Sequence, residues 1–409
     1  MKILLINKFH YLRGGAEQVY FNTKKVLEKN GHQVVCFSMK DERNEPCQQD
    51  GFFVKNVDFE NNKQWFWKAL RYLYYPEAGR KLEQLIREEE PDVAHLHNIS
   101  HHLSTSIIKV LNKHKIPIVQ TLHDYQWIAP NYNMFSRGAI DESCRKHKYY
   151  NCIFHKCVRN SFWASVLAVL ELYYYWIMKP YKKIQLFISP SQFLKDKYID
   201  YGFPPIVKVI PNFLDCNNFK PEYNPGKYFI YVGRLSFEKG IMTLLKAVKR
   251  NQEINLKIVG SGPQELEIKR YLELNRITNV ELIGSKYGYE LYDLMKYSKA
   301  VVVPSEWYEN YPMVVIEAMA LGKPVIASDL GGLSEMVDME INGWLVNAGN
   351  VDALKHVLQK VNSLAPEQII SIGQAARQKV EHNNSSDKYY ESLMRAYLGI
   401  MAKYKLGLG

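Results

Sequence analysis

Glu309 and Glu317 stand eight positions apart in the stretch SEWYENYPMVVIE, residues 305–317, with no other acidic residue between them. Pro312 suits the first turn of a helix, and residues 312–321 are predicted to form one, so Glu309 precedes the helix and Glu317 lies about one turn inside it. Carboxylates repel phosphate but accept hydrogen bonds from hydroxyl groups. The pair therefore predicts a site for sugar or ribose hydroxyls at the start of this helix.

Arg234 and Lys239 follow another predicted strand, residues 228–233, and a helix is expected from about Ile241. Backbone N–H groups and the dipole at a helix N-terminus add to the charge of two cations, so this loop is suited to a diphosphate. Ordinary solvated surface cations are the alternative, and the residue order excludes a P-loop. Together with the glutamates, the loop predicts a ligand that carries both phosphates and sugar hydroxyls.

Gly14 and Gly15 lie in the turn between a predicted strand at residues 2–6 and a predicted helix at residues 16–30. Paired glycines let backbone N–H groups approach a ligand closely. A plain tight turn explains them equally well. Both interpretations stay open on the residues alone.

His123 comes directly after the predicted strand at residues 116–122, with Asp124 next to it. The ligand-facing loops of a parallel sheet emerge at such strand ends, so a functional and a structural role are equally open for this pair. His95 and His97 alternate along another predicted strand, and a structural role is favoured for both. His123 is therefore the candidate site histidine.

Six cysteines are too few and too scattered for a disulfide framework in 409 residues, and reduced thiols are expected. Five residues could form a zinc cluster, but their spacing matches no standard pair of C-x-x-C knuckles. These residues are Cys144, His147, Cys152, His155 and Cys157. A loop with incidental thiols is the favoured interpretation, so no metal site is predicted.

Short β-rich runs alternate with amphipathic helical stretches, which predicts an α/β fold of parallel sheets with helices on both faces. The length favours two domains, and a Pro- and Asn-rich stretch at residues 211–227 indicates the linker between them. We place the domains at residues 1–213 and 218–385. The predicted strands are residues 2–6, 33–37, 92–97, 116–122, 184–189, 207–211, 228–233, 256–260, 280–284, 300–305 and 324–328.

The formal net charge of +11 predicts an anionic partner, such as a phosphorylated ligand, a nucleic acid or an anionic membrane. Residues 143–195 hold nine Lys or Arg and a single acid, Glu171, among many aromatic residues. Within them, residues 161–178 predict a core or interfacial helix rather than a membrane span. The short first apolar run does not fit a secretory signal, so a cytoplasmic protein is expected.

The order and spacing of these motifs resemble the retaining glycosyltransferases of family 4. Their GT-B fold has two facing doubly wound domains with the active site in the cleft between them. The resemblance covers nearly the whole chain. It rests on GGAE (14–17), TLHD (121–124), PSQF (190–193), VIPNFLD (209–215), VGRLSFEKG (232–240), VGSGP (259–263), the two glutamates eight positions apart (309 and 317), EAMALGKPVIAS (317–328) and GG-x-x-E (331–335).

The resemblance implies roles for the residues singled out above. Arg234 and Lys239 would hold the donor's diphosphate, Glu317 the nucleotide ribose, and Glu309 the hydroxyls of the transferred sugar. Gly14 and Gly15 would approach the phosphates, and His123 would lie beside the reacting centre. The backbone after Glu309 would face the donor through Asn310, Tyr311, Pro312 and Met313. Many family members have a Pro-Phe-Gly-like sequence there, and this chain departs from it with Asn310, Tyr311 and Pro312.

The resemblance further implies metal-independent, retaining transfer of a sugar from a nucleotide-diphosphate sugar, with no cofactor and a UDP- or GDP-sugar as donor. The acceptor would be a saccharide or a lipid-linked polysaccharide precursor. The basic, aromatic stretch at residues 143–195 independently suggests that the first domain lies on the inner face of the plasma membrane, and an ordinary packed helix pair with solvated lysines is an equally open alternative. Further candidates for the same surface are Trp65, Phe66, Trp67, Lys68 and Arg71. The last helix, expected within residues 386–409, would cross back to the first domain. A sugar-nucleotide epimerase or a phosphorylase is the alternative enzyme. A basic nucleic-acid-binding protein is disfavoured, because no recognition motif supports it.

Overall fold

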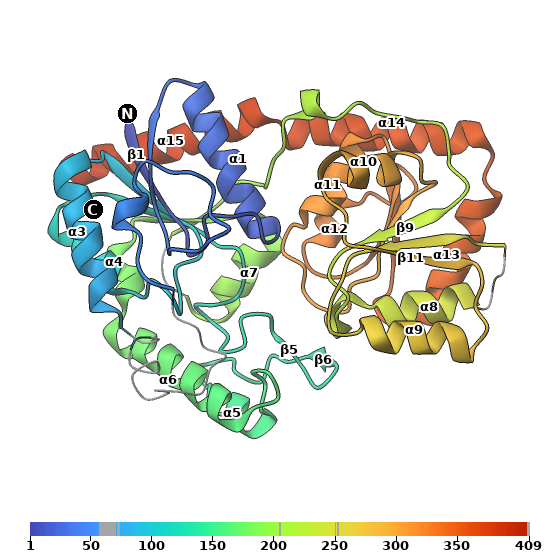
Figure 1. Cartoon of the computed structure of the whole chain (residues 1–409), viewed down its shortest axis with the longest axis horizontal. Helices are drawn as coiled ribbons and strands as arrows, with labels where there is room; N and C mark the ends of the chain where they lie inside the picture. Colours follow the sequence, from blue (N-terminus) through green and yellow to red (C-terminus); the bar gives the residue numbers. More distant parts are fainter. Residues whose placement is uncertain (57–70, 72–73, 204–205, 250, 252, 407–409) are drawn as a thin grey trace. The chain divides into compact units, whose positions relative to one another are not determined.

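The computed structural model describes residues 1–56, 71, 74–203, 206–249, 251 and 253–406 (Figure 1). Its contacts divide the chain into two compact units. The first unit comprises Met1–Asn133, Glu142–Pro211 and Asp387–Gly409, and the second comprises Met134–Asp141 and Asn212–Ser386. Each unit is built around a six-stranded parallel sheet, which confirms the predicted α/β class.

The sheet of the first unit has the strand order β2-β1-β3-β4-β7-β8. Its strands are β1 (Lys2–Ile6), β2 (Gln33–Phe37), β3 (Val93–Leu96), β4 (Ile118–Thr121), β7 (Leu186–Ser189) and β8 (Val207–Val209). Its helices are α1 (Gly15–Lys29), η1 (Asp50–Phe52), α3 (Pro76–Glu89), α4 (Ser106–Lys113), α5 (Asn151–His155), α6 (Phe162–Met178), η2 (Pro180–Lys183), α7 (Gln192–Asp200) and α15 (Ser386–Lys405). Every residue of the central strands β3 and β4 is buried, as expected for a parallel sheet with both faces covered.

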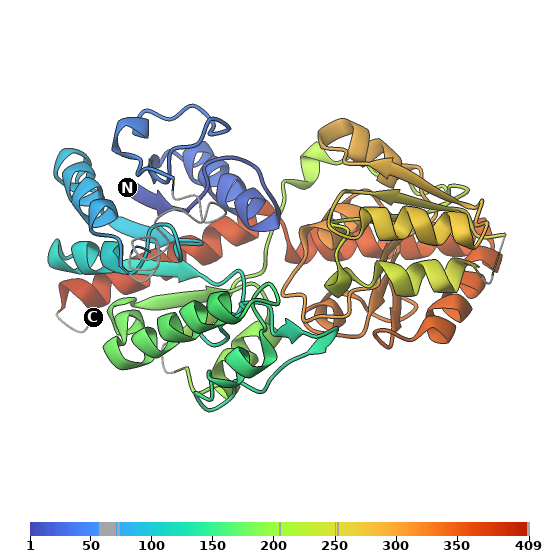
Figure 2. The ribbon, with the colours of Figure 1, turned by 60° about the horizontal axis from the view of Figure 1, so that its bottom comes forward.

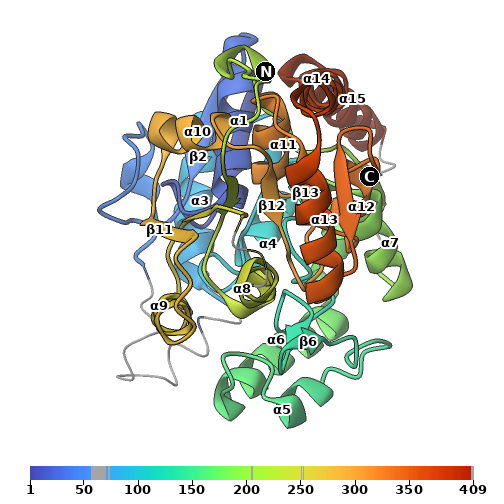
Figure 3. The ribbon, with the colours of Figure 1, turned by 90° about the vertical axis from the view of Figure 1, so that its right-hand side faces the viewer.

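The second unit has the strand order β11-β10-β9-β12-β13-β14, and the hairpin β5-β6 is grouped with it. Its strands are β5 (Phe135–Ser136), β6 (Ala139–Ile140), β9 (Phe229–Val232), β10 (Leu256–Val259), β11 (Val280–Gly284), β12 (Val301–Val303), β13 (Val325–Ser328) and β14 (Gly343–Val346). Its helices are η3 (Cys216–Asn218), η4 (Phe237–Lys239), α8 (Ile241–Lys249), α9 (Glu265–Leu274), α10 (Gly288–Lys296), α11 (Met313–Ala320), α12 (Leu333–Met336), α13 (Val351–Ser363) and α14 (Pro366–Asn383). Figure 3 shows α10 and α11 on one side of the strands and α8, α9 and α13 on the other.

The predicted strands all form, and the main omission is β14, whose glycine start weakened the strand pattern. Its Gly343 is required, because a Cβ there would lie 2.1 Å from the Val325 carbonyl oxygen. Helix α15 spans Ser386–Lys405, within the range expected, and is grouped with the first unit from Asp387. Its Tyr389 hydroxyl lies 3.0 Å from the Thr23 hydroxyl of α1, both buried, which joins the chain's last helix to its first.

Cys152 and Cys157 form a disulfide, so the expectation of reduced thiols is wrong at these two positions. Helix α5 ends at His155, and Lys156 adopts a left-handed conformation that brings the Cys157 N–H to 3.1 Å from the Cys152 carbonyl oxygen. This reversal places the two Cα atoms 5.2 Å apart, within reach of a disulfide. The bond removes two thiols from the cluster considered for zinc.

Helices α5 and α6 lie side by side in the first unit (Figure 2). Trp163, Leu170 and Ile177 repeat at helical spacing along one face of α6, and they are exposed: Trp163 is 72% and Ile177 65% accessible. The opposite face, including Leu172 and Tyr175, is buried. Among the helices that the structure describes, none combines the length and apolar character needed to cross a bilayer. Helix α6 is therefore buried along one side and exposed along the other.

Candidate active site

The second sheet reverses its strand order between β9 and β12. The chain runs outward from β9 to β10 and β11, then returns to place β12 on the other side of β9. Ligands of doubly wound sheets bind beyond the carboxyl ends of the strands at such a reversal. The loop after β9 carries Arg234 and Lys239, and the loop after β12 carries Glu309. The topology therefore brings the predicted cations and the first glutamate to one position.

These two loops are joined closely by their backbones. The Glu306 N–H donates to the Glu238 carbonyl over 2.8 Å. Gly240 has φ +67° and packs so tightly that a Cβ would lie 1.9 Å from the Pro304 carbonyl oxygen. Only glycine satisfies both conditions at low cost. Gly240 thus sets the approach of the cationic loop to the glutamate loop.

Lys239 and Glu309 form an ion pair, with Nζ 2.7 Å from Oε1. Ser305 donates a second hydrogen bond to the same oxygen over 2.7 Å, and the Lys239 ammonium lies 5.1 Å from the Trp307 ring centroid. Burial of Glu309 by itself would raise the pKa of its carboxyl, but the charge and hydrogen bond of Lys239 and the bond from Ser305 outweigh it, and the pKa is lowered. Glu309 is therefore an ionised carboxylate held in one position.

Arg234 is exposed, and its guanidinium makes no hydrogen bond or ion pair within the described ranges. Its backbone is well held, since the buried Tyr231 hydroxyl donates to the Arg234 carbonyl over 2.8 Å. The next residue, Leu235, donates its N–H to Ser261 and accepts from Gln264. The structure thus fixes the base of the Arg234 side chain while its charged end faces solvent.

Gly331 and Gly332 hold the backbone at Glu309 in place, a role that the sequence analysis missed. The Gly332 N–H donates to the Glu309 carbonyl over 2.6 Å, and a Cβ on Gly332 would lie 1.8 Å from the Asn310 carbonyl oxygen. Gly331 has φ +66°, and its Cβ would meet the Glu309 carbonyl oxygen at 2.6 Å. The paired glycines of the GG-x-x-E motif are the sequence signal for this role. Their close contact with the backbone carbonyls of Glu309 and Asn310 explains why glycine stands at both positions.

The segment after Glu309 is anchored at Tyr311. Asn212 donates to the Tyr311 carbonyl over 2.8 Å, and Asn384 donates to its hydroxyl over 3.0 Å. Burial raises the pKa of Tyr311 to about 12. Pro312 is the N-cap of α11 and Met313 its first residue, so the predicted helix begins one residue later than expected. Where this chain departs from a Pro-Phe-Gly-like sequence, the hydrogen bonds of Tyr311 thus hold the loop in place.

Glu317 lies one turn inside α11 and is buried, as predicted from its spacing to Glu309. The Tyr292 hydroxyl of α10 donates to its Oε1 over 3.4 Å. Burial, followed by the charge of Glu317, raises the pKa of Tyr292. Tyr292 is a neighbour that the sequence analysis did not identify.

The first sheet has its own reversal, between β1 and β3. Gly14 is the N-cap of α1 and Gly15 its first residue, and both are exposed at the start of the helix. A Cβ on Gly14 would meet nothing closer than 3.8 Å, so packing does not demand glycine there. Glu17 is buried in the same helical turn, and burial raises its pKa.

His123 belongs to a row of three histidines. The His97 Nδ1 lies 2.9 Å from the His123 Nε2, and the His95 ring stacks on His97 with centroids 4.6 Å apart. His95 in turn contacts the Tyr397 hydroxyl of α15 at 2.6 Å and the Thr121 hydroxyl at 2.7 Å. Burial, and then the charge of Lys8, lowers the pKa of His123 to about 4, so the ring is neutral near pH 7. His95 and His97 therefore position His123, which agrees with the structural role favoured for them.

Lys8 is a further residue that the sequence analysis missed, since it lies two positions after β1 in no motif. Burial lowers its pKa, whereas the charges of Asp124 and Glu17 raise it. Asp124 accepts from the Gln126 N–H over 3.0 Å, and burial raises its pKa. One lysine, two acids and His123 thus surround the ligand-facing end of the first sheet.

Two sequence families match the chain. Residues 13–218 match the one described as Glycosyltransferase Family 4, and residues 217–379 match the one described as Glycosyl transferases group 1. The Escherichia coli UDP-Gal:alpha-D-GlcNAc-diphosphoundecaprenol alpha-1,3-galactosyltransferase is 25% identical over 63% of this chain and 69% of its own length.

Solved structures share the fold over the whole chain. Sucrose-phosphate synthase from Thermosynechococcus elongatus has a TM-score of 0.72 with 19% identity, covering 98% of this chain and 99% of that one. HepE of Anabaena, in complex with UDP-glucose, has a TM-score of 0.68 with 19% identity, covering 98% and 100%. These neighbours have the GT-B fold. Because the family described as Glycosyltransferase Family 4 matches residues 13–218, about half of the chain, the chain belongs to that family.

Proposed function

We propose that this chain transfers a sugar from a nucleotide-diphosphate sugar to a saccharide or lipid-linked acceptor, with retention of configuration and without a metal ion. The observation that carries the proposal is the Lys239–Glu309 pair at the strand-order reversal of the second sheet. A cation for the diphosphate and a carboxylate for sugar hydroxyls stand 2.7 Å apart there. A ligand that joins a diphosphate to a sugar would satisfy both groups at once.

Catalysis by these residues would be electrostatic. An ammonium group has three N–H donors, and Glu309 takes one from Lys239, so the others can be directed to phosphate oxygens. Arg234 would add its solvent-facing guanidinium to the same phosphates. Both cations would stabilise the negative charge that grows on the departing nucleotide diphosphate. Glu317 would accept from the ribose hydroxyls.

Retention implies that the acceptor hydroxyl attacks from the face of the leaving group, while a phosphate oxygen takes its proton. A neutral His123, oriented by His97, would accept a hydrogen bond from a sugar hydroxyl near the reacting centre. A UDP-sugar is the first donor to test. The galactosyltransferase relative is named for UDP-Gal, and the Anabaena protein was solved with UDP-glucose. The same relative supports a lipid-linked acceptor.

A thermal-shift panel of UDP-, GDP- and ADP-sugars tests the donor on the wild type and on Glu317→Ala. One nucleotide series should stabilise the wild type and lose its effect in the variant. Release of free nucleotide diphosphate only when an acceptor is present distinguishes transfer from epimerisation or phosphorolysis, and NMR of the product's anomeric proton reports retention. Wild-type turnover in folded Glu309→Gln and Lys239→Ala would refute the site.

We further propose that the α5–α6 surface rests on an anionic membrane, at its cytoplasmic face, to reach a lipid-linked acceptor. Exposed apolar side chains on this surface are Phe154, Phe162, Trp163, Leu170, Ile177 and Met178. Exposed cations beside them are Lys156, Arg159, Lys179, Lys182 and Lys183. The one acid of this stretch, Glu171, is buried against the Tyr175 hydroxyl and His101, so the surface is uniformly positive.

Sedimentation with phosphatidylglycerol vesicles at low salt tests this surface. Wild-type protein should sediment, and Trp163→Ser with Ile177→Ser should stay in the supernatant. Leu266→Ser on α9, a still more exposed apolar residue of the second unit, is the control and should behave as wild type. Failure of the wild type to sediment would overturn the proposal. Trp65, Phe66, Trp67 and Lys68, considered for the same surface, lie outside the described residues, and Arg71 stacks on Tyr75.

A further inference from the structure

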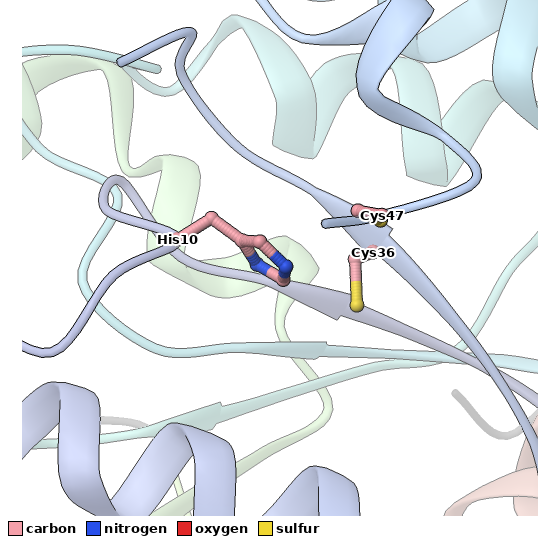
Figure 4. Close-up of side chains that lie close together, drawn as sticks. All are labelled: His10, Cys36 and Cys47. Atoms are coloured by element: carbon pink, nitrogen blue, oxygen red, sulfur yellow. The ribbon is translucent and has the colours of Figure 1, made fainter. Parts of the chain in front are cut away.

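Three residues with no part in the proposed function meet at one edge of the first sheet. Cys36 lies on the edge strand β2, His10 on the loop after β1, and Cys47 on the segment between β2 and η1. One candidate ligand atom from each lies within 4.8 Å of the others. Figure 4 shows the His10 ring pointing toward the two cysteines.

The surroundings of the three residues hold them in place. His10 and Cys36 are buried, and Cys47 is half-buried. The Tyr20 hydroxyl lies 2.9 Å from the His10 Nδ1, which fixes the ring and leaves the other nitrogen for a metal. The Gln49 side-chain oxygen accepts from the Cys47 thiol over 3.3 Å, and its amide donates to Glu89 over 3.0 Å. A histidine oriented by a second hydrogen bond is typical of metal ligands.

We propose that His10, Cys36 and Cys47 bind one Zn²⁺, with an oxygen from Gln49 or water in the fourth position. Two thiolates and an imidazole are ligands that zinc prefers in tetrahedral geometry. Zinc bond lengths place such ligand atoms about 3.5–3.8 Å apart, so movements of roughly 1 Å complete the site. Both thiols lose their protons to solvent as the two Zn–S bonds form.

Zinc at this position joins two loops to the edge strand. The Glu45 N–H already donates to the His10 carbonyl over 2.8 Å, and the Met39 N–H donates to the Lys8 carbonyl over 3.4 Å. The loop that holds His10 continues to Gly14 and the start of α1. The metal is therefore structural, and it orders the connection between β1 and α1.

Metal content tests the proposal without reference to activity. The full-length protein is purified with a mild reductant, stripped with a chelator, and titrated with Zn²⁺ while its mass is followed by native mass spectrometry. One equivalent should bind, and Co²⁺ in its place should give an intense thiolate-to-cobalt charge-transfer band. Cys47→Ser should abolish both signals, and Tyr20→Phe should weaken binding by about 10- to 100-fold.

Cys216→Ser is the matched control, because Cys216 is another free, half-buried cysteine but lies in the second unit. It should bind zinc as the wild type does. Alkylation mapping of the stripped protein establishes that Cys36 and Cys47 are free thiols before titration. Three results would each overturn the proposal. The folded protein could fail to bind zinc although both thiols are free, or Cys47→Ser could bind zinc as well as the wild type. A Cys36–Cys47 disulfide that persists in reductant is the third.

Discussion

The ion pair between Lys239 and Glu309 can be tested as an energetic coupling. At 2.7 Å and an effective dielectric constant of about 20, the gross attraction is about 6 kcal/mol. The cost of removing Glu309 from water offsets much of this, since its side chain is 6% exposed against 24% for Lys239. We therefore expect a net coupling of about 1–3 kcal/mol from a double-mutant cycle.

The cycle combines Lys239→Met, Glu309→Gln and the double variant. Lys239→Met should cost the most, about 3 kcal/mol, because it leaves a buried carboxylate without its cation. Glu309→Gln should cost about 1–2 kcal/mol, because Lys239 still reaches solvent and the amide oxygen still accepts its hydrogen bond. The double variant should lose less than both single variants together.

Urea denaturation followed by circular dichroism measures each free energy of unfolding. The control cycle uses Lys257 and Glu281, a pair on neighbouring strands of the same unit at 3.5 Å, with Glu281 61% exposed. Its coupling should stay below about 1 kcal/mol. If the Lys239–Glu309 cycle were additive within about 0.5 kcal/mol, the pair would carry no stability and the reasoning from burial would be refuted.

The pH dependence of the same cycle has a definite sign. The pKa of Glu309 is lowered below its ordinary value of 4.5 in the folded protein. Its contribution to stability is therefore present above pH 4.5 and is lost as the pH falls through the folded pKa. The coupling measured at pH 7 should shrink in acid, and a coupling that grew on acidification would contradict the assignment.

Three further outcomes are expected. Gly332→Ala should lower the free energy of unfolding by about 1–3 kcal/mol, because its Cβ would lie 1.8 Å from the Asn310 carbonyl oxygen. In the same denaturation assay Gly399→Ala should be neutral or stabilising, because a Cβ on this helical glycine would meet nothing within 4 Å. Burial lowers the pKa of His95 to about 3 and that of His123 to about 4. Below pH 6.5 the unfolded chain therefore binds more protons than the folded chain. Calorimetry should show the free energy of unfolding falling by about 2 kcal/mol per histidine between pH 8 and pH 5. His97→Gln should flatten this dependence and the exposed His356→Gln should not; an unchanged profile in His97→Gln would count against a neutral histidine row. Tyr397→Phe should lower stability by about 1 kcal/mol through loss of its bond to His95, with Tyr390→Phe as the half-exposed comparison.

Local sequence patterns predicted much of the fold. Each strand of the two sheets except β14 shows a short apolar run next to turn residues, and hydrophobic periodicity is readable within a few residues. Helix α11 begins where Pro312 indicated, within one residue, because proline restricts the backbone locally. The spacing of Glu309 and Glu317 likewise placed the second carboxylate inside the helix before any contact was known.

The local sequence of α6 did not determine which face of this helix is buried. Trp163, Leu170 and Ile177 repeat at helical spacing, yet they are exposed, and the buried side holds Glu171. Burial of Glu171 becomes possible only because the Tyr175 hydroxyl and His101 hydrogen-bond to it. Tertiary partners of this kind leave no pattern within the segment itself.

Sequence alone therefore determined the elements and the chemical character of the candidate site, because both depend on residues that are near neighbours in the chain. Only the tertiary structure decided which groups meet: Lys239 with Glu309 across 70 positions, and His10 with Cys36 and Cys47. It also showed that Gly332 is needed for its contact with the backbone of Asn310. Such contacts depend on strand order and on close backbone approach, which arise only when the whole sheet is assembled.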